Sequence, residues 1–362
     1  MKSLGSKMDL FDIQELSHKC LGYPTNQKFD ASVLSKYLNT HLNNVGDPWG
    51  GSTFALNTHV IERKVVCQFA SLYHYDDENT WGYVTNGGTE GNMYGLYLAR
   101  EMFPHSMLYF SDQTHYSVRK IAHILDMNYV IVKSQPDGAI DLLDFANLIL
   151  QYRDRSAIVL VNIGTTMKGA IDDFVGVYDS IINNSIHSYY LHADAALLGM
   201  TQPFLRPPQW LKNFAKCVDS ISVSGHKFIG MPFPSGVVLA RRRHVDRIKS
   251  VVEYIGSNDT TISGSRNALS PILFNDALQN YDVIKKNVEY TESLTQYLVK
   301  NLPNAQNNSF SNTVYFRKPS NELCRKYMLA VEGDIAHIVV MPSVKKEVLD
   351  EFILNYGMDK VV

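Results

Sequence analysis

Between Trp81 and Val223, short apolar runs alternate with stretches of helical periodicity, and this alternation is what most constrains the fold. The runs are rich in β-branched and aromatic residues, as strands are. They lie at residues 83–85, 107–110, 129–132, 157–161, 189–191 and 221–223, with helices expected at 89–103, 116–126, 141–152 and 172–184. Near-continuous apolar strands separated by helices predict an α/β fold with a mostly parallel central sheet covered on both faces.

The segments on either side of this region have other patterns. Residues 8–20, 30–43 and 57–73 have helical spacing, but the first 56 residues are too poor in apolar surface to form a core alone. We expect them to pack on another part of the protein or on a second subunit. After residue 270 we expect a long helix to about 301, then strands at 313–316 and 335–340 and helices near 320–330 and 344–355. The predicted organisation is an N-terminal helical segment (1–56), a large domain (57–270) and a small α+β domain (271–362).

Composition excludes several classes of function. A net charge of −2 gives no bulk electrostatic attraction to nucleic acid or to an anionic membrane. The four cysteines are scattered without a CxxC pair, which predicts neither a disulfide framework nor a metal site. The N-terminus lacks the apolar core of a signal peptide, and no stretch approaches the roughly 18 apolar residues of a membrane span. These features predict a cytoplasmic protein.

The polar candidates follow the predicted strands, where open α/β sheets bind their ligands. After the first strand, Asn86-Gly87-Gly88-Thr89 leads into a helix whose free N–H groups suit a phosphate, although Thr89 as a plain helix cap fits equally well. The loop is neither GxGxxG nor a Walker motif, so dinucleotide or triphosphate binding is not supported. His115 follows the second strand and Thr166 the fourth, and each alone also fits an ordinary turn.

Two charged residues are harder to explain as surface groups. Asp194 stands among alanines at the end of an apolar strand, where a buried carboxylate needs a cationic or donor partner. Lys227 follows the next strand, between His226 and Phe228. A desolvated lysine loses its proton more easily and becomes a nucleophile for an aldehyde. Taken alone, Lys227 also fits a loop lysine beside a capping histidine.

Together these residues predict a pyridoxal 5'-phosphate site. Lys227 would form the Schiff base and Asp194 would hold the proton of the pyridine nitrogen. His115 would stack on one face of the ring, opposite Ala196. The phosphate contacts would come from Gly88, Thr89, Thr166, Ser224 and His226.

The chain resembles the pyridoxal-phosphate-dependent group II amino-acid decarboxylases, most closely the bacterial histidine decarboxylases and then the plant serine decarboxylases. The resemblance rests on WGYVTNGGTEGN (81–92), THYSV (114–118), VNIGTTMKGAIDD (161–173), LHADAALLGM (191–200) and SVSGHKFIG (222–230), with TISGSRN (261–267) and GDIAHIVVMPSV (333–344) beyond. It extends from about Gly22 to the C-terminus. The chain departs from the family pattern at Ala268-Leu269, where Gly-His is frequent, and at Ser235, where cysteine is expected. These departures affect the identity of the substrate more than the chemistry.

The resemblance implies the fold of aspartate aminotransferase type I and a homodimer with sites at the subunit interface, where residues 1–56 would pack. It implies the same roles for Lys227, Asp194 and His115, with the α-carbon protonated by His115, Lys227 or the loop residue Tyr254. Histidine to histamine is the expected reaction. Serine, methionine or a branched-chain amino acid remain alternative substrates. Two further alternatives are an aminotransferase, for which Arg266 would be the carboxylate-binding arginine, and a non-catalytic binding protein on the same fold.

Overall fold

The computed structural model describes residues 10–76 and 78–359. Its centre is a seven-stranded sheet in the order β2-β8-β7-β6-β5-β3-β4. Six strands run in one direction, namely β2 (Thr80–Thr85), β3 (Met107–Ser111), β4 (Tyr129–Val132), β5 (Ala157–Asn162), β6 (Tyr189–Asp194) and β7 (Ser220–Ser224). The seventh, β8 (Gly236–Arg241), is antiparallel to both neighbours. The predicted fold class, a mostly parallel sheet in an α/β protein, is confirmed.

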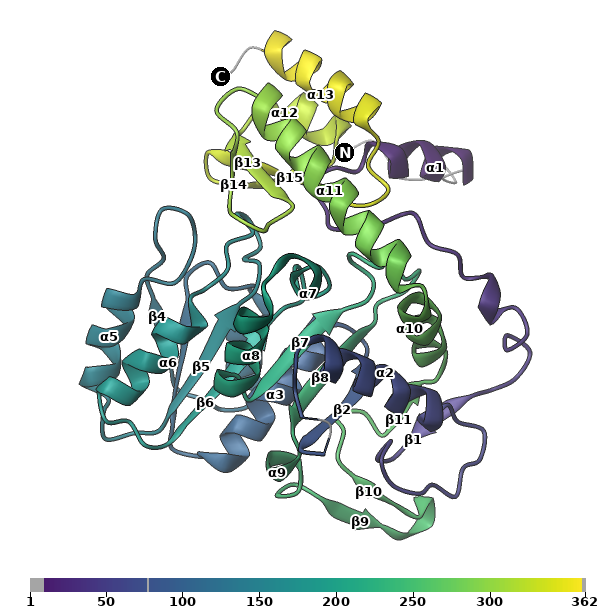
Figure 1. Cartoon of the computed structure of the whole chain (residues 1–362), viewed down its shortest axis with the longest axis vertical. Coiled ribbons are helices and arrows are strands. Elements are labelled where there is room, and N and C mark those ends of the chain that lie inside the picture. The colour runs from purple at the N-terminus through teal and green to yellow at the C-terminus, as the bar shows by residue number, and fades with distance from the viewer. Residues whose placement is uncertain (1–9, 77, 360–362) are drawn as a thin grey trace, which may run out of the picture.

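Helices cover both faces of this sheet (Figure 1). Alternate strand residues enter two apolar clusters, because successive side chains of a strand point to opposite faces. One face packs against α3 (Gly88–Met102), α4 (Ser117–Ile124) and α9 (Arg242–Val245). The other packs against α2 (His59–Leu72), α5 (Leu142–Gln151), α6 (Phe174–Asn183), α8 (Pro208–Cys217) and α10 (Leu269–Gln279). The short α7 (Gln202–Leu205) follows β6.

A second, four-stranded antiparallel sheet forms the end of the chain. Its order is β12 (Gln306–Asn307), β13 (Thr313–Arg317), β15 (Ile335–Val339) and β14 (Ala330–Glu332). The helices α11 (Tyr281–Asn301), α12 (Asn321–Lys326) and α13 (Lys346–Met358) accompany it (Figure 1). The single helix expected at 270–301 is two, α10 and α11, because the backbone leaves helical geometry at Asn280.

The N-terminal segment is less helical than the sequence suggests. Its described residues, from 10 onward, contain α1 (Leu10–Lys19) and the 3-10 turn η1 (Ser32–Leu34), and the first two residues of the helix expected at 8–20 lie outside them. The helix expected at 30–43 is wrong, because Asp30 accepts the Ser32 N–H in a local turn and 43–45 is a strand. That strand, β1 (Asn43–Val45), pairs with β11 (Ser265–Asn267), and β9 (Ser250–Val252) pairs with β10 (Ser257–Asp259) around the 3-10 turn η2 (Glu253–Ile255).

Residues 21–26 connect the two sheets. Leu21 exchanges backbone hydrogen bonds with Tyr327 and Val339 beside the small sheet. Asn26 then donates its side-chain amide to the Phe228 and Ile229 carbonyls, at 2.9 and 3.2 Å, in the turn that follows β7. The segment therefore closes one side of the space between the sheets. No helix among the described residues has the length and apolar character to cross a membrane.

Candidate active site

A cavity of about 470 Å³ opens at the carboxyl edge of the large sheet. The loops after β2, β3, β5, β6 and β7 line one side, and residues 22–24 with the small sheet line the other. The structure brings nine of the predicted site residues together here: Gly88, Thr89, His115, Thr166, Asp194, Ala196, Ser224, His226 and Lys227. The tenth, Tyr254, does not line this cavity.

The start of helix α3 forms a cradle for an anion. Gly87, the cap residue, has φ +122°, and no side chain caps the helix, so its first N–H groups stay available. A Cβ on Gly88 would come within 2.9 Å of the Ala196 Cβ and 3.0 Å of the Ser224 Oγ. Glycine therefore keeps this space open. The Ser224 hydroxyl is buried without a hydrogen-bond partner in this chain.

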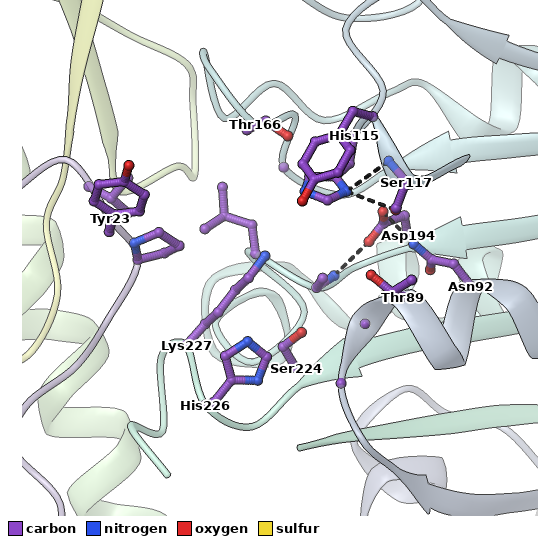
Figure 2. Close-up of a pocket in the computed structure, with 18 of the residues that line it drawn as sticks. Tyr23, Thr89, Asn92, His115, Ser117, Thr166, Asp194, Ser224, His226 and Lys227 are labelled. Atoms are coloured by element: carbon purple, nitrogen blue, oxygen red, sulfur yellow. Dashed lines mark hydrogen bonds between the residues drawn. The ribbon is translucent and has the colours of Figure 1, made fainter. Parts of the chain in front are cut away.

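Asp194 is a buried carboxylate at the end of β6. Its Oδ2 accepts the Asn92 side-chain amide at 2.7 Å, and its Oδ1 accepts the Ala196 N–H at 3.1 Å (Figure 2). These two uncharged donors hold the carboxylate in place without supplying a positive charge to balance it. Its remaining lone pairs are free for a cationic or N–H partner in the cavity.

Lys227 projects into the same space from the turn after β7 (Figure 2). Burial lowers the pKa of its amine, and the charge of Asp194 opposes this shift. The amine is therefore closer to its neutral, nucleophilic form than an exposed lysine. Beside it, His226 Nδ1 lies 3.0 Å from the carbonyl oxygen of Ser235 and 3.2 Å from the Ser235 backbone nitrogen.

His115 lies on the cavity wall after β3 (Figure 2). Ala196 also lines the cavity, from the loop after β6. The Nδ1 of His115 accepts from the Ser117 N–H at 3.3 Å and lies 2.8 Å from the Ser117 hydroxyl. The proton of the neutral ring is thus on Nε2. Burial is the main cause that lowers the pKa of His115, with Asp194 acting in the opposite direction.

Comparison with known proteins decides the family. The pyridoxal-dependent decarboxylase conserved domain matches residues 31–339. The chain belongs to this family. A histidine decarboxylase of Pseudomonas entomophila is 44% identical over 94% of this chain and 86% of its own length. A histidine decarboxylase of Mesorhizobium japonicum is 41% identical over 95% of both chains. Among solved structures, the L-methionine decarboxylase of Streptomyces sp. 590 superposes with a TM-score of 0.87 at 25% identity, covering 97% of this chain and 93% of that one.

The pocket of this pyridoxal-dependent decarboxylase fits its cofactor, pyridoxal phosphate. The unpartnered Ser224 hydroxyl and the uncapped start of α3 supply donors where an anion would be held. Asp194 and Lys227 supply a carboxylate and an amine across the same cavity. The donor set matches a phosphate, a ring N–H and an aldehyde. The prediction of the cofactor, made from the residues, is confirmed by the family.

Other residues that line the pocket were not predicted from the sequence. Asn92 lies within a quoted motif, but its contact with Asp194 depends on how α3 packs on the sheet. Tyr23 lines the wall across from Asp194 (Figure 2). Pro24 also lines the cavity, as do His337 and Val339 of the small sheet. Tertiary packing alone brings these four to the site.

Two residues named from the sequence lie elsewhere. Tyr254 is 83% exposed on η2. Arg266 is buried, ion-paired with Glu62 and hydrogen-bonded to the Gly46 carbonyl at 3.0 Å. Its guanidinium binds Glu62 and Gly46 in the core. The hypothesis that Arg266 binds the substrate carboxylate is therefore wrong for this chain. The cavity lining drawn from the described residues contains no arginine.

Proposed function

We propose that this chain is a pyridoxal-phosphate-dependent carboxy-lyase that converts L-histidine to histamine and CO₂. The observation that carries the substrate is the identity of 41–44%, over 88–95% of the chain, with relatives named histidine decarboxylase. The observation that carries the chemistry is the single cavity that holds Lys227, Asp194 and His115.

Each residue has a defined task in this proposal. Lys227 would hold the cofactor aldehyde through its amine, and Asp194 would keep the proton on the ring nitrogen. The start of α3 with Thr89, Ser224 and His226 would hold the phosphate, joined by Thr166 across the cavity. When bound, pyridoxal phosphate supplies a sink for the electron pair left on the α-carbon as CO₂ departs.

The protein must then return one proton to the α-carbon, since histidine plus a proton gives histamine plus CO₂. His115 can supply it from Nε2, because Nδ1 is engaged by Ser117. Lys227 and Tyr254 are the other candidates for this donor. Tyr254 is exposed on η2 and does not line the cavity of its own subunit. As the proton donor, it would therefore act on the pocket of the partner subunit.

A homodimer with the site at the subunit interface is part of the same proposal. The exposed side chains of Val251 (78%) and Tyr254 (83%) on the β9–η2–β10 hairpin support it, because large apolar groups gather there at the surface. We also propose that residues 1–56 pack at this interface, that 57–270 and 271–362 act as large and small domains, and that the enzyme works in the cytoplasm.

One observation favours a second substrate. The solved structure that superposes with a TM-score of 0.87 acts on L-methionine by its name. Methionine would place an apolar chain where histidine places an imidazole, against a wall that includes Tyr23 and Val339.

The test is to incubate the holoenzyme with an equimolar mixture of the common L-amino acids and to identify the amines by mass spectrometry. Histamine as the main product, absent with Lys227→Ala, supports the proposal. A methionine-derived amine or ethanolamine would overturn the substrate assignment and leave the chemistry in place. Keto acids without amines would mean an aminotransferase, and no product with any substrate would mean a binding protein.

A further inference from the structure

A line of four buried polar side chains ends at Asp194. Asn92 Nδ2 lies 2.7 Å from Asp194 Oδ2, and Asn92 Oδ1 lies 3.0 Å from His192 Nε2. His192 Nδ1 in turn lies 2.7 Å from the Ser220 hydroxyl. His192 and Ser220 are fully buried, and Asn92 is 2% exposed. Only Asp194 and Asn92 line the cavity, so most of this line lies behind its wall.

With a neutral imidazole, the chemistry of the partners fixes the direction of every hydrogen bond. The Asn92 amide must donate to the carboxylate, because the reversed amide would set two acceptor oxygens against each other. Asn92 Oδ1 then accepts, so His192 carries its proton on Nε2. His192 Nδ1 is left as an acceptor for the Ser220 O–H. All three bonds therefore donate toward Asp194.

The surroundings of His192 favour its neutral state, in which Nδ1 accepts from the Ser220 hydroxyl. Complete burial lowers the pKa of the imidazole to about 4, with only the Asp194 charge opposing the shift. With a neutral ring in one tautomer, each hydrogen bond of the line polarises the next one, and the ring adds no charge of its own.

Helix α3 is shaped to admit this imidazole. A Cβ on Gly95 would overlap three atoms of the His192 ring, and one on Gly91 would overlap the Ser222 side chain. The two glycines are one turn apart on the same helix that carries Asn92, so the ring lies directly against the helix backbone. This packing fixes the ring independently of the hydrogen bonds.

We propose that Asn92, His192 and Ser220 form a positioning relay that keeps Asp194 ionised and oriented toward the pyridine nitrogen of the cofactor. The inference rests on the cofactor role given to Asp194 above. Without the Asn92 donor, a buried carboxylate holds its charge less easily, and the proton shared with the pyridine nitrogen moves from that nitrogen to Asp194. Asn92 touches Asp194 directly, while His192 and Ser220 act through it.

The experiment follows the protonation of the bound cofactor itself. Pyridoxal phosphate carrying a heavy-isotope ring nitrogen is loaded into wild type, Asn92→Ala, Ser220→Ala and the control Tyr75→Phe. The Tyr75→Phe variant loses a buried hydrogen bond to the Val218 carbonyl, and Tyr75 does not line the cavity. Nitrogen NMR then gives the ratio of protonated to neutral ring nitrogen in each holoenzyme at neutral pH.

The relay predicts that this ratio falls about tenfold or more in Asn92→Ala, with a loss of kcat of about 10- to 100-fold. Ser220→Ala, at the far end, should move in the same direction by less, and Tyr75→Phe should match wild type. An unchanged pyridinium in both relay variants, or an equal shift in the control, would overturn the relay. Since the readout needs no substrate, it is independent of whether histidine is the amino acid consumed. If Asn92→Ala does not fold, Ser220→Ala alone decides between these outcomes.

Discussion

At the scale of single residues, Ser224 shows how the pocket is prepared for an anion. Its hydroxyl is buried and unpartnered in the protein alone. Leaving such a group unsatisfied is unfavourable, so a ligand that pairs with it gains that free energy on binding. Ser270 provides a matched comparison, because its hydroxyl is also buried and unpartnered but does not line the cavity.

We therefore expect Ser224→Ala to weaken pyridoxal phosphate binding about 10- to 100-fold, as for the loss of a hydrogen bond to a charged group. Ser270→Ala should leave the affinity unchanged. The measurement is a titration of the cofactor-free protein followed by visible absorbance. Equal affinities for wild type and Ser224→Ala would remove this serine from the phosphate site.

The residues that could be predicted from the sequence are those at strand ends. Lys227, Asp194 and His115 each follow an apolar run, and parallel strands bring their carboxyl ends to one edge. The residues of the relay could not be predicted, because their contacts depend on the face of α3 that meets the sheet. The same holds for Tyr23 and His337, which reach the cavity from distant parts of the chain.

At the scale of elements, α3 packs closely on the sheet because Gly91 and Gly95 have no side chains where the helix meets Ser222 and His192. Gly95→Ala should destabilise the protein by about 1 to 3 kcal/mol, as overpacking a core does. Gly357→Ala is the control, since a Cβ there meets nothing within 4 Å and alanine favours the helix by up to about 1 kcal/mol. Chemical unfolding of both variants gives the comparison. Equal stability of the two would contradict the close packing of His192 against α3.

Most elements of the large sheet were predictable from their apolar runs, and the exceptions have physical causes. Strand β8 was missed because its short apolar part, 237–240, lies between a turn-rich loop and a run of arginines. The helix expected at 30–43 failed because polar residues of that segment form local turns and β1 pairs with distant β11. Pairing partners so far apart in the sequence leave no local signal.

At the scale of the whole molecule, His192 links stability to pH. Its pKa falls from 6.5 to about 4 on folding, so the unfolded chain binds the proton more readily. The contribution of neutral His192 is complete above about pH 6.5 and is lost as the pH falls toward 4, an effect of about 3 kcal/mol. Asp172, with a pKa raised by burial to about 6, titrates in the opposite direction.

The contribution of His192 is isolated by comparing wild type with His192→Gln, since Asp172 is common to both. The gap in the free energy of unfolding between the two proteins should be about 3 kcal/mol smaller at pH 4 than at neutral pH. Urea unfolding at both pH values gives the gap. A gap that stays constant would mean that His192 does not titrate as its burial implies.

The proposed dimer makes a prediction about shared sites. If Tyr254 donates a proton to the pocket of the partner subunit, Lys227→Ala and Tyr254→Phe are each inactive. Their hybrid dimers would then contain one complete site. Mixing equal amounts under subunit exchange should restore about a quarter of wild-type activity, by random pairing in a symmetric dimer. Full activity of Tyr254→Phe alone, or no recovery on mixing, would exclude this role.

The central claim is that the cavity at the sheet edge binds pyridoxal phosphate through Lys227. The most direct measurement is to reduce the holoenzyme with borohydride, which makes the link between lysine and cofactor permanent, and to locate the added group by peptide mass spectrometry. We predict a single pyridoxyl group on the peptide that contains Lys227, absent in Lys227→Ala. A group on any other lysine, or none in protein that has bound the cofactor, would contradict the account.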